Sequence, residues 1–322
     1  MPATKLTVEE RRERAEAALE AELQRIVDSG EYAAWFQKMS LFHRYSPTNS
    51  MWIMAQLQQR AIEGERGPEP TGVVASYRTW QQLGRQVRTG ERGIMVWHPK
   101  THWVDPATGE RARPPKTDQD RARLERRVSF GIGYVFDQAS TDGEPLDLGR
   151  PAPADAPREL ADHLDRYCRQ HRIAVEVRPL RPGLHGYYQR DGDRIVLTDS
   201  ASPGERAATL AHELAHREDP ELIAAHEAGD RSYYAHNRPD CEAVAEAAAH
   251  ALSARFGHDI TGNAAGYIAG WIRGDVERFK QLHERVGLVS RQLVPSNRLD
   301  ELLTAARTNV AEDRTVELGR RR

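Results

Sequence analysis

The first 62 residues have the hydrophobic spacing of helices. Residues 6–30 are strongly charged and carry a thin apolar stripe at Leu19, Leu23 and Ile26, which lie three and four residues apart. Residues 31–62 continue this spacing. The Tyr-Ser-Pro sequence that ends at residue 47 predicts a break after which a further helix begins. The chain is therefore expected to start as helices.

Residues 71–136 change to the pattern of short strands and turns. The expected elements are a strand at 73–76, a helical turn at 77–83, a hairpin around Thr89-Gly90 leading into a strand at 94–98, and a second strand at 128–136. Residues 105–127, between the two strands, are polar and charged and contain two adjacent prolines. We expect a mobile loop there.

The second half of the chain alternates helices with a small sheet. The expected elements are a helix at 158–171, a strand at 173–177, a hairpin at 187–197 with an Asp191-Gly192 turn, helices at 203–217 and around 242–256, and closing helices at 266–271 and 275–286. The helix at 203 begins with Ser202-Pro-Gly-Glu205. This is the signature of a capping box with proline at the first helical position.

These elements predict an α+β chain of two domains. A Pro-, Ala- and Gly-rich stretch between the two patterned regions has the composition of an interdomain linker. The expected boundaries are an N-terminal α+β domain at 1–140, a linker at 141–157, a second domain at 158–290 and a polar tail at 291–322. The second domain is expected to combine two adjacent helices with a small sheet whose edge is antiparallel.

A His-Glu-Leu-Ala-His sequence supplies the strongest candidate chemistry. His212 and His216 lie four residues apart, so on a helix they share one face and can occupy two corners of a zinc tetrahedron. Glu213 between them is then placed to act as the general base on a water at the metal. The alternative is a buried helix with two hydrogen-bonded histidines.

A second helical stretch supplies the remaining ligand. Glu242 is the candidate third ligand, and Glu246, one turn later, can accept a hydrogen bond from a ligand histidine. We expect one Zn²⁺ per chain, with another divalent transition metal possible. Cys241 is expected to be a buried thiol rather than a ligand. Four aromatic or imidazole residues between the two helices could stabilise an oxyanion or simply pack, and these are His226, Tyr233, Tyr234 and His236.

Composition limits the partners. The net charge is −2 and the pI about 6.7, so any nucleic-acid surface must be local. The two cysteines imply no disulfide framework and fit a reducing cytoplasm. We expect neither a secretion signal nor a membrane span, because the chain has no apolar run long enough for one.

The local basic surface falls in the first half. Residues 71–130 hold twelve Lys and Arg against six Asp and Glu, and five of the six tryptophans lie in the first 103 residues. Arginines interleaved with aromatic residues suit a groove for single-stranded nucleic acid, although the same aromatics could form the core of a small domain. The candidate nucleic-acid-binding residues are Tyr45, Asn49, Arg78, Trp80, Arg85, Arg88, Arg92 and Trp97.

Several of these motifs together resemble the ArdC-like antirestriction proteins. The resemblance rests on Tyr45-Ser-Pro-Thr-Asn49 with Gln56, on the stretch from Tyr77 to Gly93, on Tyr134-Val-Phe-Asp137, and on the His212 and Glu242 motifs. The second half is also similar to the ImmA and IrrE type of peptidase domain. The resemblance implies single-stranded DNA binding by the first domain and a metal site at His212, His216 and Glu242.

Three classes of function follow. The first is a DNA-binding antirestriction or DNA-protecting protein of a mobile element. The second is a regulatory zinc peptidase that cleaves a repressor or another DNA-bound protein. The third is a metal-stabilised interaction module without catalysis. The sequence does not identify a protein substrate. Residues 105–127 are unusually charged for the family, and residues 291–322 match nothing in its pattern.

Overall fold

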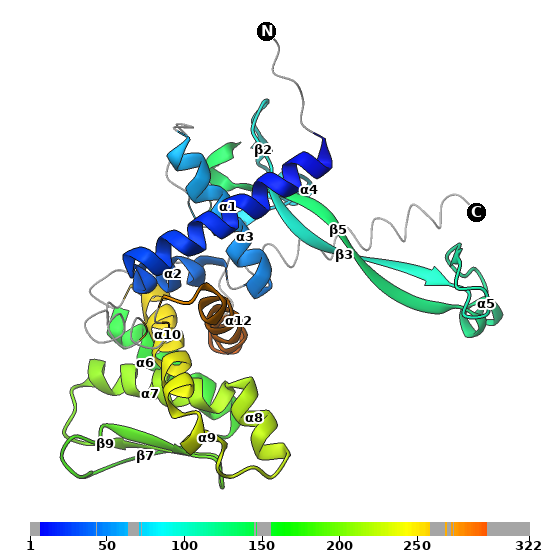
Figure 1. Cartoon of the computed structure of the whole chain (residues 1–322). Coiled ribbons are helices and arrows are strands. Elements are labelled where there is room, and N and C mark those ends of the chain that lie inside the picture. Colours follow the sequence, from blue (N-terminus) through cyan, green and yellow to red (C-terminus); the bar gives the residue numbers. More distant parts are fainter. Residues whose placement is uncertain are drawn as a thin grey trace.

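Figure 1 shows the computed structural model, in which helices form the body and a long two-stranded arm leaves it on one side. The described residues are 7–42, 44–63, 71, 73–144, 146, 156–257, 268, 272 and 274–294. None of the helices in these ranges combines the length and the apolarity that crossing a membrane requires.

Three helices begin the chain as predicted. They are α1 (Val8–Ser29), α2 (Tyr32–Met39), continued by a short 3-10 turn, η1 (Ser40–Phe42), and α3 (Pro47–Ile62). Thr7 and Glu10 form a capping box at the start of α1, and Gly30 ends this helix in the left-handed region at φ 72°. Ser46 caps α3, with Pro47 at its first turn, which confirms the predicted break.

The arm is formed by β3 (Ile94–Val104) and β5 (Glu125–Asp137), which pair antiparallel along their length. β1 (Val74–Ala75) and β4 (Arg111–Ala112) complete the sheet in the order β1-β5-β3-β4. The expected mobile loop at 105–127 was wrong in part, because it contains β4 and the helix α5 (Asp118–Arg123). Acidic residues in the first turn of α5 and arginines in the last complement the helix dipole.

The predicted hairpin around Thr89-Gly90 is also wrong. α4 (Tyr77–Gln82) is followed by β2 (Gln86–Val87), which pairs with β6 (Thr141–Asp142) rather than with β3. A single turn, η2 (Gln138–Ser140), precedes β6. Arg85 and Arg88 donate to backbone carbonyls in this later segment, and these long-range hydrogen bonds favour the observed pairing.

The second half places a small sheet beside a group of helices. β7 (Ala174–Arg178) runs parallel to β9 (Arg194–Thr198), and β8 (Gly186–Gln189) pairs antiparallel with β9 on its other side. The antiparallel edge was predicted. The helices are α6 (Ala156–His171), α7 (Pro203–Glu218), α8 (Pro220–Glu227), α9 (Tyr233–His236), α10 (Arg238–Arg255) and α12 (Val276–Leu293).

One hydrophobic cluster joins the two halves of the chain. It includes buried side chains from α1, α2 and α3 together with others from α6, α7, α10 and α12. The predicted linker at 141–157 begins inside β6, and most of its remaining residues lie outside the described ranges. The closing helix expected at 266–271 and most of the tail at 291–322 also lie outside them. The domain boundaries stay a prediction.

The fully buried His283 of α12 connects the two halves of the chain through hydrogen bonds to the N-terminal helices. The indole N–H of Trp35 donates to His283 Nδ1 at 2.9 Å, so the ring proton lies on Nε2, which donates to the carbonyl of Pro47 at 3.1 Å. Burial lowers the pKa of His283 to about 4. A proton added at Nδ1 would face the Trp35 donor directly, so the folded state requires the neutral ring.

We therefore expect acid to weaken the fold through His283. The folded-state pKa lies below the ordinary value of 6.5, so unfolded chains bind the proton first as the pH falls. The stability from this residue is complete above pH 6.5 and is lost towards pH 4, by roughly 3 kcal/mol in total. Urea unfolding between pH 7.5 and 4 tests this. His283→Gln should show a shallower pH slope, and parallel slopes in the two proteins would contradict the assignment.

Candidate metal centre and basic cleft

Helix α7 holds the two histidines of the predicted metal motif. Ser202 accepts a hydrogen bond from the backbone of Glu205, whose carboxylate accepts one from the backbone of Ser202, so the predicted capping box is present. The helix buries its alanine and leucine face. His212 and His216 therefore lie one turn apart on the same side.

The structure brings His212, His216 and Glu242 together. The two imidazole Nε2 atoms are 3.1 Å apart, and Glu242 carboxylate oxygens lie 3.4 Å from His212 Nε2 and 3.7 Å from His216 Nε2. A tetrahedral zinc ion with bonds of about 2.0–2.1 Å separates its ligand atoms by about 3.3 Å. Among the described residues, this trio is the group of His, Cys, Asp and Glu whose ligand atoms converge.

The electrostatics of the trio favour a cation. Burial lowers the pKa of His212, but hydrogen bonds with Glu242 and Glu246 outweigh this effect and raise that pKa to about 10. Burial and the neighbouring His212 lower the pKa of His216 to about 3, which keeps that ring neutral. The carboxylates thus hold one positive charge beside a neutral imidazole. A divalent metal ion fits this donor set.

Glu246 lies where a supporting carboxylate is needed. Its Oε2 is 3.2 Å from His212 Nδ1, so it can fix the orientation and tautomer of that ring. His216 differs, because its Nδ1 is buried without a hydrogen-bond partner among the described residues. Its helix turn is held instead by Arg190, which donates to the carbonyl oxygens of His216 and Arg217. The sequence analysis did not identify Arg190.

The candidate ligands His212, His216 and Glu242 line a cavity of about 780 Å³, and Glu213 and Tyr234 line it too. Glu213 is 8% exposed, and burial raises the pKa of its carboxyl group. Tyr234 donates to Glu242 Oε1, and its ring lies edge-on to His216 with centroids 5.6 Å apart. Of the four residues considered for oxyanion stabilisation, the structure therefore places Tyr234 at the site. His226 pairs with Arg231 instead.

Cys241 lies beside this centre without joining it. The thiol is fully buried, and Arg285 donates to its sulfur at 3.5 Å. Burial raises the pKa of the thiol to about 11, so it stays protonated. This agrees with the expectation of a buried thiol.

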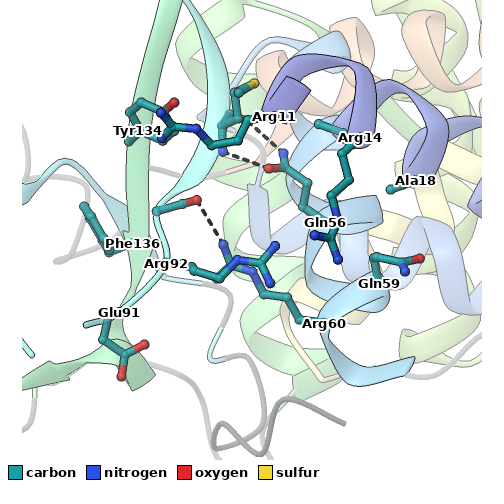
Figure 2. Close-up of a pocket in the computed structure, with 13 residues that line it drawn as sticks. Arg11, Arg14, Ala18, Gln56, Gln59, Arg60, Glu91, Arg92, Tyr134 and Phe136 are labelled. Carbon is teal, nitrogen blue, oxygen red and sulfur yellow. Dashed lines mark hydrogen bonds between the residues drawn. The ribbon is translucent and has the colours of Figure 1, made fainter. Parts of the chain in front are cut away.

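A second cavity, of about 740 Å³, lies in the first half of the chain. Figure 2 shows its lining, in which the side chains of Arg60 and Arg92 lie beside each other below Arg14. We call this cavity the basic cleft, and its arginine and aromatic lining residues are Arg11, Arg14, Arg60, Arg92, Tyr134 and Phe136. Helices α1 and α3 form one wall, and the base of the β3–β5 arm forms the other.

Glu63 sits at the edge of this charge cluster. It pairs with Arg14 and, at 3.5 Å, with Arg92. Hydrogen bonds from Gln59 and Arg14 lower the pKa of Glu63 to about 2. Glu91 also lines the cleft, so among the described residues four arginines face two carboxylates there. The cleft is therefore positively charged, although the whole chain is not.

Four of the predicted nucleic-acid-binding residues make contacts within the fold. Trp80 is fully buried and donates to the carbonyl of Phe136, so neither face of its ring is open to a base. Arg85 is 7% exposed and donates to Thr141 and to nearby carbonyls. Asn49 bonds to both backbone groups of Trp97, and Tyr45 donates to the carbonyl of Val74. These contacts hold the helices on the sheet.

The other predicted residues are more open. Arg92 lines the basic cleft, and Arg78 is exposed on α4. Trp97 is half-buried against Trp52, with ring centroids 5.6 Å apart. Arg88 pairs with Glu91 and donates to the carbonyl of Ala139.

The sequence analysis missed most of the cleft. Arg11, Arg14 and Arg60 lie on helices for which the sequence analysis named no binding residue at these positions. Tyr134 was noted as part of a family motif but not as a contact. The one local signal was the run of arginines on a single face of residues 6–30, and nothing in the sequence shows that this face meets the strands.

One known family matches the part of the chain that forms the basic cleft. Residues 9–136 match the family model for the N-terminal domain of anti-restriction factor ArdC. This ArdC-matched segment contains the whole lining of the basic cleft. The metal centre lies outside it.

Two kinds of comparison with individual proteins show more distant similarity. An uncharacterised protein of Sinorhizobium fredii, y4eC, is 30% identical over 172 residues, which are 52% of this chain and 48% of that protein. The chain thus spans about half the length of this curated relative. The crystal structure of metal-free antirestriction ArdC from plasmid R388 is 24% identical and gives a TM-score of 0.42 over 82% of this chain and 86% of that one. The Mn(II)-bound structure is 21% identical, with a TM-score of 0.40 over 81% and 84%.

The trio predicts specific metal binding. Adding Zn²⁺ to metal-stripped protein should raise the melting temperature, because binding to the folded state stabilises it. His212→Ala and His216→Ala should abolish the rise, whereas Glu246→Gln should weaken affinity about 10- to 100-fold by releasing the His212 ring. Calorimetric titration measures both effects. His226→Ala is the matched control, and an unchanged affinity in His212→Ala would contradict the site.

Proposed function

We propose that this protein binds single-stranded DNA through the basic cleft and acts in antirestriction or in protecting the DNA of a mobile element. The observation that supports this most directly is the cleft itself, in which four arginines surround two aromatic side chains within the ArdC-matched segment. Guanidinium groups bind phosphates, and open rings provide faces on which bases stack.

The arrangement of the cleft favours a single strand over a duplex. In a duplex the faces of the bases are covered by their neighbours, so aromatic rings gain little from contact with it. Tyr134 and Phe136 lie on the sheet wall of the cleft, and Arg11 sits 5.5 Å above the Tyr134 ring. A base inserted there would meet a ring and a cation together.

A metal-dependent peptidase activity is the second candidate function. It is favoured by the combination of His212, His216 and Glu242 with the buried carboxyl group of Glu213. A bound Zn²⁺ or other divalent ion supplies Lewis acidity towards a water or a peptide carbonyl. Glu213 would accept the proton of the attacking water and return it to the leaving amine. The Tyr234 hydroxyl would donate a hydrogen bond to the developing oxyanion.

The edge strand β8 provides a place for a peptide. It lies at the edge of the three-stranded sheet, and Gly186, Tyr187 and Tyr188 line the metal cavity. An extended chain can add to such an edge through backbone hydrogen bonds. The backbone N–H of Tyr188 already binds the Glu213 carboxylate, so strand and base are held together. We propose as substrate a DNA-bound repressor that presents an extended peptide segment to this edge.

The DNA-binding proposal predicts a salt-dependent preference for single strands. In fluorescence anisotropy, the full chain should bind a labelled single strand more tightly than the matching duplex, with affinity falling as salt rises. Arg11→Ala and Arg92→Ala should each weaken binding across sequences and reduce the salt slope by about one. Arg158→Ala, an exposed arginine of α6, is the control. Equal affinity for single and double strands would count against the proposal.

The peptidase proposal predicts a separable defect. Glu213→Gln should lower any metal-dependent cleavage about 10²- to 10⁴-fold, because the proton acceptor is lost while the ligands remain. The same variant should keep wild-type affinity for zinc and for single-stranded DNA. The effect is measured as the rate of cleavage of casein and of DNA-binding repressors, with and without single-stranded DNA. Glu227→Gln, on α8, is the control. Unchanged cleavage in Glu213→Gln would exclude this mechanism.

A further inference from the structure

The outer part of the β3–β5 arm has one apolar face and one polar face. Cross-strand partners share a face, and the register pairs Trp97 with Ile132, Pro99 with Phe130, Thr101 with Val128 and Trp103 with Arg126. We call the surface formed by these eight residues the apolar track. Figure 1 shows the arm leaving the helical body with α5 near its tip.

The track is unusually open for its composition. Phe130 is 68% exposed and Val128 is 57% exposed, whereas Trp97, Trp103 and Ile132 are half-buried. Large apolar side chains that are exposed next to one another commonly mark a binding surface. The opposite face of the same strands is polar, and there Ser129 lies near His102. The large apolar side chains that the outer arm exposes, Val128 and Phe130, therefore lie on one face only.

The track is continuous with the basic cleft. Continuing the same strand face towards the body leads from Phe130 and Ile132 to Tyr134, and from Trp97 to Met95. Tyr134 and Met95 line the cleft, and Arg11 lies over the Tyr134 ring. From Val128 to Tyr134 the strand rises about 20 Å. A chain leaving the cleft along this face would thus meet aromatic and apolar side chains in succession.

The charges around the track suit a polyanion. Arginines bound it at both ends, with Arg126 beside Trp103 at the outer end and the four cleft arginines at the inner end. Residues 98–130 carry eight Lys and Arg against five Asp and Glu, and two of these acids pair with arginines of the arm. Phosphates could follow the positive margin while bases turn towards the rings.

We propose that the apolar track extends the basic cleft as a stacking surface for single-stranded nucleic acid, with Phe130 as its main exposed platform. This inference rests on the proposed function and adds the path of the strand and the residue that stacks on it. The Phe130 side chain carries no charge. It contributes affinity without changing the number of phosphates that are neutralised.

The test compares substitutions at one exposed position in the full chain. Phe130→Ala should weaken binding of a long single-stranded oligonucleotide about tenfold, with an unchanged salt slope. Phe130→Trp should restore wild-type affinity, and Phe130→Leu, which is apolar but has no ring, should bind like Phe130→Ala. Ser129→Ala, on the polar face next to it, is the matched control and should bind like wild type.

An abasic oligonucleotide of equal length separates stacking from other effects. Wild type and Phe130→Ala should bind it equally, because it has no bases to stack. If wild type binds the normal strand and Phe130→Ala binds it equally well, the track is not a stacking surface and the inference is wrong. If wild type itself does not bind single strands, this result contradicts the proposed function and not only the stacking role of Phe130.

Discussion

The candidate metal centre depends on the close packing of α7 against α10. Half of the residues that these helices bury are alanines, including Ala211 and Ala215 on one helix and Ala245 and Ala248 on the other. Small side chains allow two helix axes to approach closely, with strong dispersion contacts along the seam. Without that approach, Glu242 could not reach the imidazoles that α7 presents. A larger residue in the seam would separate the ligands before it unfolded the protein.

Helix α12 connects this pair to the rest of the chain. Arg285 forms two hydrogen bonds, of 2.6 and 2.7 Å, with Asp219, the fully buried residue that ends α7 and caps α8. Two residues earlier, His283 bonds to Trp35 and Pro47 in the N-terminal helices. A buried ion pair contributes little net stability, but the loss of either partner leaves an uncompensated charge. The helix therefore fixes how the two halves meet.

Local signals in the sequence predicted the elements but not all of their uses. The capping box, the His212 spacing and the hairpin of β8 and β9 depend on neighbouring residues, and each appears in the structure, although the left-handed residues of the hairpin turn are Gly192 and Asp193. The roles of Trp80 and Arg85 depend on carbonyl groups more than 50 residues away, so their sequence context could not separate core from contact surface. For the same reason the sequence analysis did not identify the cleft arginines of α1 as binding residues.

The distribution of aromatic residues follows from what covers each face of the sheet. Near the body, α1 and α3 lie over the strands, and Trp52 and Met95 are buried there. Beyond the reach of these helices, the same strand face continues with Phe130 and Val128 open to solvent. Exposed apolar side chains that adjoin one another on a hairpin face commonly mark an interaction surface. Four arginines lie at the inner end of that face. A single-stranded nucleic acid could therefore place phosphates at the arginines and stack bases on the exposed ring.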